Sequence, residues 1–173
     1  MSFAVVIASV AFVRLAGEGV PEQRLKAALL SKFPQFVEWP ASAVSDRPTI
    51  DVCVATPDPF GHDLEELLTG EHVSDRPLAL RHVTTMADVA GCHVLYLPAL
   101  GSGRHPLLGA VANRPVLTVS DAPNFLDTGG MVVLRVVGGR LRFDIDAAAT
   151  RHAGLRVSSQ LLRLAVSVRG GVS

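Results

Sequence analysis

Two carboxylates lie where ligands often bind in α/β proteins. Asp58 and Asp121 follow apolar runs that read as strands, Thr49–Ala55 and Val116–Ser120. In open α/β sheets, ligands bind in the crevice outside the carboxyl ends of the strands, so both side chains are candidate ligand-binding groups. A proline stands within two residues after each aspartate, and this combination is also typical of turns. That second interpretation gives the two residues a purely structural role.

No combination of side chains points clearly to catalysis, to a metal or to a cofactor. The six histidines are not spaced as metal ligands are, and the G-x-S-x-G turn of serine hydrolases is missing. Gly101–Pro106 contains only two of the three glycines of a dinucleotide-binding loop. A small α/β hydrolase would need a histidine beside Ser120 or Ser158. We therefore predict a protein that is not an enzyme and uses no metal or cofactor.

Charge is distributed unevenly along the chain, although its net value is zero. Residues 134–173 contain seven Arg against two Asp, a net charge of +5, and residues 1–133 carry the balancing −5. A basic end of this kind could bind an acidic partner or an anionic small ligand, and Arg142 and Arg156 are candidates for that contact. The alternative is biased residue usage, because the chain has 14 Arg and only 2 Lys. Basic patches with interleaved aromatic residues are missing, so we predict no nucleic-acid partner.

The first twenty residues predict export. Phe3–Val13 is an apolar run of eleven residues, which is shorter than the roughly 20 that span a membrane and typical of a secretory signal. We assign residues 1–20 to a signal peptide or its remnant and residues 21–173 to one domain. A buried first strand is the alternative interpretation. Cys53 and Cys92 lie in or beside apolar strand-like runs, so they could be buried thiols or, in an exported protein, a disulfide.

The elements that would position these residues alternate along the chain. Strands are expected at Thr49–Ala55, Leu78–Val83, His93–Leu97 and Val116–Ser120, and helices at about 22–37, 60–68 and 106–112. Two apolar runs then flank Gly138-Gly139 and predict an antiparallel hairpin over residues 131–145. A final helix is expected at about 157–168, capped by Ser158 or Ser159. This order predicts one α/β domain with a largely parallel sheet, followed by a hairpin and a final helix.

Aromatic residues are concentrated in and just after the first expected helix. Phe33, Phe36 and Trp39 fall within seven positions of a chain that has nine aromatic residues in all. Phe33 and Phe36 are three apart, so on a helix they share one face. Pro34 should kink the helix. Pro40 should end it, because a proline disfavours the α conformation at the residue before it.

Seven segments, taken together and in order, resemble the YfiR family of periplasmic proteins. They are KAALLSKFPQFVEWP at 26–40, DPFG at 58–61, GCHVLYL at 91–97, RPVLTVSDAPNF at 114–125, GGMVVL at 129–134, LRFDID at 141–146 and AGLRVSSQLLRLA at 153–165. The resemblance spans about residues 22–166. It implies a periplasmic regulator without catalytic activity, built on a mixed sheet flanked by helices and often found as a homodimer.

The resemblance also implies partners. Members of the family restrain an inner-membrane diguanylate cyclase by binding its periplasmic portion, and an outer-membrane, OmpA-like lipoprotein can sequester them. Related domains are fused to sensor kinases, so a small-molecule sensor acting on a membrane kinase is the alternative function. The pair Cys53 and Cys92 resembles a disulfide of the family, whereas Asp146 stands where Asn is common.

Candidate partner contacts come from the residue types that dominate protein interfaces. They are Phe36, Trp39, Phe125, Gln160 and Arg163. Gln160 and Arg163 lie off the apolar face of the final expected helix, so we expect them to be exposed. For Phe36 and Phe125, burial in the core is an equally good interpretation.

Overall fold

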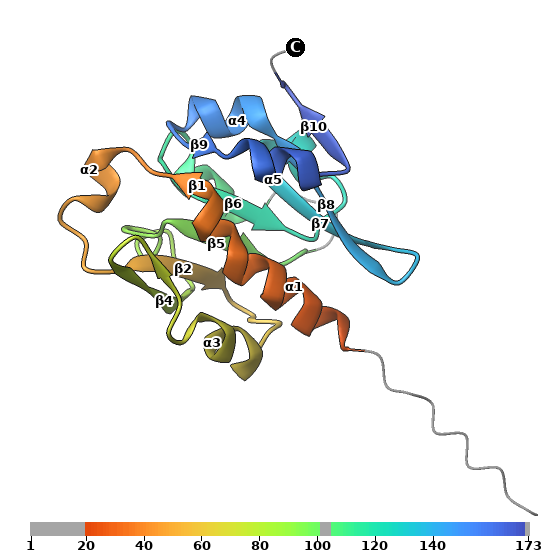
Figure 1. Ribbon diagram of the computed structural model, residues 1–173, viewed down its shortest axis with the longest axis horizontal. Coiled ribbons are helices and arrows are strands. Elements are labelled where there is room, and N and C mark those ends of the chain that lie inside the picture. The colour runs from red at the N-terminus through yellow and green to blue at the C-terminus, as the bar shows by residue number, and fades with distance from the viewer. Residues whose placement is uncertain (1–19, 101–104, 172–173) are drawn as a thin grey trace, which may run out of the picture.

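A mixed β-sheet forms the centre of the structure, and helices cover its faces (Figure 1). The computed structural model describes residues 20–100 and 105–171, so most of the predicted signal segment and residues 101–104 of the glycine-rich turn lie outside the described residues. The sheet contains β2 (Ile50–Ala55), β3 (His72–Val73), β4 (Arg76–Val83), β5 (Val94–Leu97), β6 (Leu117–Ser120), β7 (Val132–Val137), β8 (Arg140–Asp146) and β10 (Ser167–Arg169). A separate two-stranded ribbon consists of β1 (Val37–Glu38) and β9 (Arg156–Val157).

The helices are mostly short. The α-helices are α1 (Glu22–Lys32), α2 (Ala41–Val44), α3 (His62–Leu68), α4 (Ala147–His152) and α5 (Ser159–Leu164), and the 3₁₀ helices are η1 (Phe33–Phe36), η2 (Pro106–Val111) and η3 (Phe125–Thr128). The helices predicted at 60–68 and 106–112 correspond to α3 and η2, the second of them being 3₁₀ rather than α.

The strand order β10-β8-β7-β6-β5-β2-β4-β3 confirms the predicted mixed, mostly parallel sheet. Neighbouring strands from β4 to β7 run parallel, as do β8 and β10, whereas β7 and β8 form the predicted antiparallel hairpin. All six residues of β2 are buried. Strands of parallel sheets that are covered on both faces read as continuous apolar runs for this reason.

Successive side chains of β2 face opposite sides of the sheet. Val52 and Val54 belong to the larger core cluster, which α1, α3 and α5 cover, whereas Cys53 belongs to the cluster under η2 and η3. Figure 1 shows α1 crossing one face of the sheet, between α3 and α5. The ring of Phe33 packs edge-on against that of Phe143, with ring centroids 5.6 Å apart.

The turn of the hairpin needs its two glycines. Gly138 and Gly139 have φ values of +58° and +72°. A two-residue turn whose central residues both have positive φ is type I′, whose twist matches that of the flanking strands, and glycine adopts this conformation without strain.

The first helix ends earlier than predicted. α1 stops at Lys32, and Pro34 lies in the first turn of η1, which continues the chain to Phe36. A proline inside an α-helix removes one backbone hydrogen bond and clashes with the preceding turn. Instead of kinking the α-helix, Pro34 lies where the helix changes from α to 3₁₀. The predicted α-helical span 22–37 is corrected to 22–32.

The prediction of a final helix at 157–168 is wrong in its second half. The hydroxyl of Ser158 accepts a hydrogen bond from the Leu161 N–H at 3.2 Å, which confirms the predicted cap. α5 ends at Leu164, and the N–H of Val166 donates to the Phe143 carbonyl at 2.9 Å. The chain then joins the sheet as β10, because pairing with β8 outweighs the local helical pattern.

Candidate functional site

The β1/β9 ribbon brings together two segments that are far apart in the sequence. Val37 lies opposite Val157, and Glu38 lies opposite Arg156. The N–H of Ser158 donates to the carbonyl of Phe36 at 2.9 Å and extends this pairing. Val37 is almost completely buried, so its side chain anchors the ribbon to the core, whereas Glu38 is exposed.

Two adjoining grooves follow the ribbon, and Arg156 lines both. One has a volume of about 310 Å³ and is lined by Trp39, Pro40, Glu38, Gly154 and Arg156. The other, of about 230 Å³, extends along Phe36 to Ser158. Arg156 is exposed, whereas Phe36 and Trp39 are half-buried. An apolar edge beside an exposed guanidinium is the composition of many protein-binding surfaces.

The last helix begins at the second groove. Ser158, which lines that groove, is also the cap of α5. Gln160 and Arg163 are exposed on this helix as predicted. Within the part of the chain that the structure describes, the guanidinium of Arg163 forms one hydrogen bond, which it donates to the hydroxyl of Ser159 at 3.3 Å. The ribbon, its two grooves and the exposed side of α5 are called the ribbon face below.

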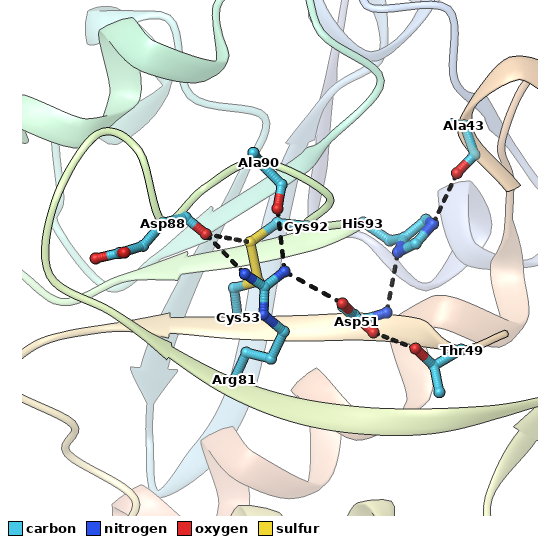
Figure 2. A network of polar contacts seen from close by, with 9 residues as sticks. All are labelled: Ala43, Thr49, Asp51, Cys53, Arg81, Asp88, Ala90, Cys92 and His93. Carbon is cyan, nitrogen blue, oxygen red and sulfur yellow. Dashed lines mark hydrogen bonds and ion pairs between the residues drawn. A yellow bond between two sulfur atoms is a disulfide. The ribbon is translucent and has the colours of Figure 1, made fainter. Parts of the chain in front are cut away.

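Trp39 is held from behind by His93. The indole Nε1–H donates to the His93 carbonyl at 3.2 Å, and the two rings meet edge to face with centroids 5.7 Å apart. The Nδ1 of His93 accepts a hydrogen bond from the Asp51 N–H at 2.9 Å, so Nε2 carries the proton and donates to the Ala43 carbonyl at 3.0 Å (Figure 2). Burial lowers the pKa of His93, and the positive charges of Arg47 and Arg76 lower it further.

Near His93, the guanidinium of Arg81 connects the loop after β4 to β2 through hydrogen bonds (Figure 2). Arg81 donates to the carboxylate of Asp51 at 3.2 Å and to the carbonyls of Asp88 and Ala90, each at 3.1 Å. The disulfide between Cys53 and Cys92, with Cα atoms 5.9 Å apart, holds the same loop to β2. The structure thus places the two cysteines, which the residues alone left open, in a disulfide. Such bonds are typical of proteins in oxidising compartments.

Asp121 has strong internal partners. Its carboxylate accepts from Lys26 Nζ at 2.9 Å and from the Ala99 N–H at 3.1 Å. Burial alone would raise the pKa of Asp121, but the hydrogen bond and charge of Lys26 outweigh burial and lower it. The pKa of Tyr96, whose buried ring lies nearby, is raised by burial and by the charge of Asp121. Asp121 anchors α1 to the end of β6.

Asp58 has a turn-forming role. Its carboxylate accepts from the Phe60 N–H at 2.7 Å and interacts with His82 Nε2 at 2.8 Å. Both strand-end aspartates thus have the contacts expected from the structural interpretation, and their binding of a ligand stays a prediction.

The remaining predicted residues are not part of the ribbon face. Arg142 is exposed on β8, directly opposite Arg135 of β7. Phe125 is only 2% exposed, and its ring packs so closely on Gly130 that a Cβ there would lie 2.3 Å from it. The prediction that Phe125 contacts a partner is therefore corrected, since the core interpretation holds for this side chain.

The serines of the hydrolase alternative have partners other than histidine. Ser120 donates to the Leu97 carbonyl at 2.6 Å and accepts from the Ala122 N–H. Ser158 accepts from the Leu161 N–H. These are backbone-anchoring contacts.

Comparison with known proteins decides the family. The model of the YfiR/HmsC-like family matches residues 23–166, which is most of the chain. The chain belongs to this family. A crystal structure of a conserved domain protein from Vibrio cholerae O1 biovar El Tor is similar over 86% of the chain, with 13% sequence identity and a TM-score of 0.44. The chain spans 60% of the length of that protein.

Several residues of this YfiR/HmsC-like site have no sequence signal of their own. Glu38, Pro40 and Gly154 line the first groove, and His93 supports Trp39 from a buried strand. His93 is a buried residue whose two ring nitrogens are both hydrogen-bonded. Its contact with Trp39 arises from folding, because the two residues come from different elements.

Two further observations concern the described part of this YfiR/HmsC-like chain. Among residues 20–100 and 105–171, no helix has both the length and the apolar character needed to cross a membrane. In the same ranges, His, Cys, Asp and Glu side chains form no group of three or more that could hold a metal ion.

Proposed function

We propose that this protein is a periplasmic regulator that restrains an inner-membrane diguanylate cyclase by binding the periplasmic portion of that enzyme. Membership of the YfiR/HmsC-like family supports the regulatory role, and the Cys53–Cys92 disulfide fits an oxidising compartment. An outer-membrane, OmpA-like lipoprotein that competes for the chain would relieve the restraint. A homodimer is a further expected assembly.

The ribbon face is the proposed contact with the cyclase, and its composition carries the proposal. It presents Trp39, the half-buried ring of Phe36 and the exposed guanidinium of Arg156 within two adjoining grooves. Tryptophan and arginine dominate interface hot spots, where truncation of one side chain costs about 2 kcal/mol or more. Trp39 is also fixed in position by His93, so little conformational freedom would be lost on binding.

The test compares variants in cells that lack the chromosomal copy of the gene. Deletion should raise cyclic di-GMP, and wild-type protein should restore the low level. Arg156→Glu reverses a charge at the centre of the ribbon face and should fail to restore it, with loss of binding to the purified periplasmic portion of the cyclase by about 30-fold or more.

Arg140→Glu is the matched control, because Arg140 is equally an exposed arginine of the basic end but lies on the hairpin. It should restore the low level like the wild type. Equal protein amounts are verified by immunoblot. The proposal is overturned if deletion leaves cyclic di-GMP unchanged or if Arg156→Glu restrains the cyclase as well as Arg140→Glu does.

A further inference from the structure

We propose that a pocket beside the disulfide binds a small organic anion through Arg47 and Arg114. The pocket has a volume of about 170 Å³ and lies between α2, the loop that carries Gly91 and the residues before β6. Apolar groups, among them Val89 and Val116, form its walls, and both arginines line it. Its lining contains no carboxylate.

Gly91 leaves room for the guanidinium of Arg47. A Cβ added to Gly91 would lie 2.6 Å from Arg47 Nη1 and 2.8 Å from its Cζ, so the guanidinium occupies the space that a side chain at position 91 would need. Gly91 also has a φ of +83°, which other residues rarely adopt. The carbonyl of Arg47 accepts from Arg76 Nε at 3.1 Å and holds the backbone in place.

The two arginines of the pocket have exposed side chains. Within residues 20–100 and 105–171, the arginines that form ion pairs are Arg24, Arg81, Arg135 and Arg169, so Arg47 and Arg114 are not neutralised by a carboxylate of the described chain. Arg114 lines the same pocket as Arg47, and no carboxylate lines it. The pocket therefore carries positive charge that a bound anion would compensate. Guanidinium groups match the oxygens of carboxylate and phosphate, which they bind in a bidentate manner.

The size and the walls of the pocket restrict the anion. Pockets for drug-sized ligands hold roughly 300–1,000 Å³, so about 170 Å³ fits only a small molecule. The apolar walls favour a short hydrocarbon body, and the arginines favour a carboxylate at one end of it. Butyrate is a suitable probe, and its amide, butyramide, has nearly the same shape without the charge.

The pocket also touches the residues that hold Trp39. His93 and Ala43 both line it. His93 binds the indole through its carbonyl and donates to Ala43 on α2, which follows Trp39 and Pro40 in the chain. An anion bound here would act on the support of the ribbon face. This regulatory consequence rests on the proposed function, whereas anion binding itself does not.

The chain contains a single tryptophan, so its fluorescence reports on this region. Purified protein is titrated with sodium butyrate and with butyramide at constant ionic strength. Butyrate should change the fluorescence of Trp39 in a saturable way and raise the melting temperature, and butyramide should do neither. The double variant Arg47→Ala/Arg114→Ala should bind butyrate at least about tenfold more weakly, and Arg140→Ala, a change at an exposed arginine of the β7–β8 hairpin, should bind as the wild type does.

Arg47→Lys/Arg114→Lys guards against loss of folding, because it keeps both charges but removes the planar guanidinium groups. It should melt as the wild type does without butyrate and still bind butyrate less well. The proposal is overturned if the wild type does not respond up to the solubility limit of the probe. It is equally overturned if butyramide has the same effect or if the alanine variant keeps wild-type affinity. Binding of butyrate without any change in affinity for the cyclase portion would leave the site established and remove only its regulatory role.

Discussion

One neutral imidazole joins three parts of the chain. His93 accepts from the backbone of β2, donates to the carbonyl of Ala43 on α2 and offers its own carbonyl to Trp39. A second proton on the ring would sit on Nδ1 and face the Asp51 N–H, so that two donors would meet where one hydrogen bond now exists. The fold therefore requires the uncharged ring.

The stability of the protein should fall as the pH is lowered from 7 to 5. The pKa of His93 is lowered in the folded state by burial and by Arg47 and Arg76, so the unfolded chain takes up the proton first. The stability that this residue contributes is complete above its unfolded pKa of about 6.5 and is lost as the pH falls below that value. His93→Gln should cost about 1–3 kcal/mol at pH 7 and should weaken the pH dependence.

Urea unfolding at pH 7 and pH 5 measures this effect. Burial also lowers the pKa of His105, so His105→Gln is measured separately to subtract its share. His62→Gln, a change at an exposed histidine, is the control for the substitution itself and should change the free energy of unfolding at pH 7 by less than about 0.5 kcal/mol. A slope between pH 7 and 5 that is the same in His93→Gln and wild type would contradict the assignment.

At the scale of elements, α1 is fixed to the sheet by a buried lysine. The side chain of Lys26 is only 6% exposed and pairs with Asp121 at 2.9 Å and with Glu22 at 2.6 Å. Burial lowers the pKa of Lys26, but its two carboxylate partners outweigh burial and raise it. The ammonium group therefore stays charged in its buried position.

Lys26→Met should lower the free energy of unfolding by about 3 kcal/mol, because it leaves the half-buried carboxylate of Asp121 without its main partner. The double variant Lys26→Met/Asp121→Asn should lose less than the sum of the single variants, with a coupling of about 1 kcal/mol or more in a double-mutant cycle. Lys32→Met is the control, since Lys32 pairs with Glu71 in an exposed position and should lose under about 1 kcal/mol. Equal losses at both lysines would refute the buried-anchor account.

The sequence predicted those elements whose signal is local. The strands β2, β4, β5 and β6 and the Gly138-Gly139 hairpin were identified because continuous apolar runs and paired glycines are local patterns, whereas the two-residue strand β3 was not predicted. β10 was missed because Val166 joins the sheet through Phe143, a contact that no local window contains. β1 and β9 are only two residues long and have no periodicity of their own.

The candidate site was predictable only in part for the same reason. Trp39 was selected from its residue type, and Arg156 from the basic charge of residues 134–173. Their position beside a common groove depends on a pairing between distant segments. Arg47 and Arg114 carry no motif, and their pocket exists only because the folded chain brings the loop with Gly91 and the segment before β6 close to Arg47. Phe125 was misassigned because an aromatic residue in a loop looks the same in sequence whether it faces a partner or the core.

For the whole molecule, the disulfide should be a major source of stability. It joins residues 39 positions apart, and closing a loop of that length removes chain entropy worth about 4 kcal/mol from the unfolded state. Cys53→Ala/Cys92→Ala should therefore unfold at clearly lower denaturant concentration than the oxidised wild type. Reductant should lower the stability of the wild type by a similar amount and leave the double variant unchanged. A difference below about 1 kcal/mol between oxidised and reduced wild type would contradict this prediction.

The pairing of β1 with β9 also bears on the order in which the protein folds. Val37 meets Val157 only after nearly every intervening strand has been synthesised and placed, and contacts between such distant residues form slowly because the chain must first close a long loop. We therefore expect the groove between Trp39 and Arg156 to form late in folding. A chain cut short before β9 would lack the partner strand of β1 and therefore the ribbon face. Under the proposed function, only a chain that extends through β9 and α5 could restrain the cyclase.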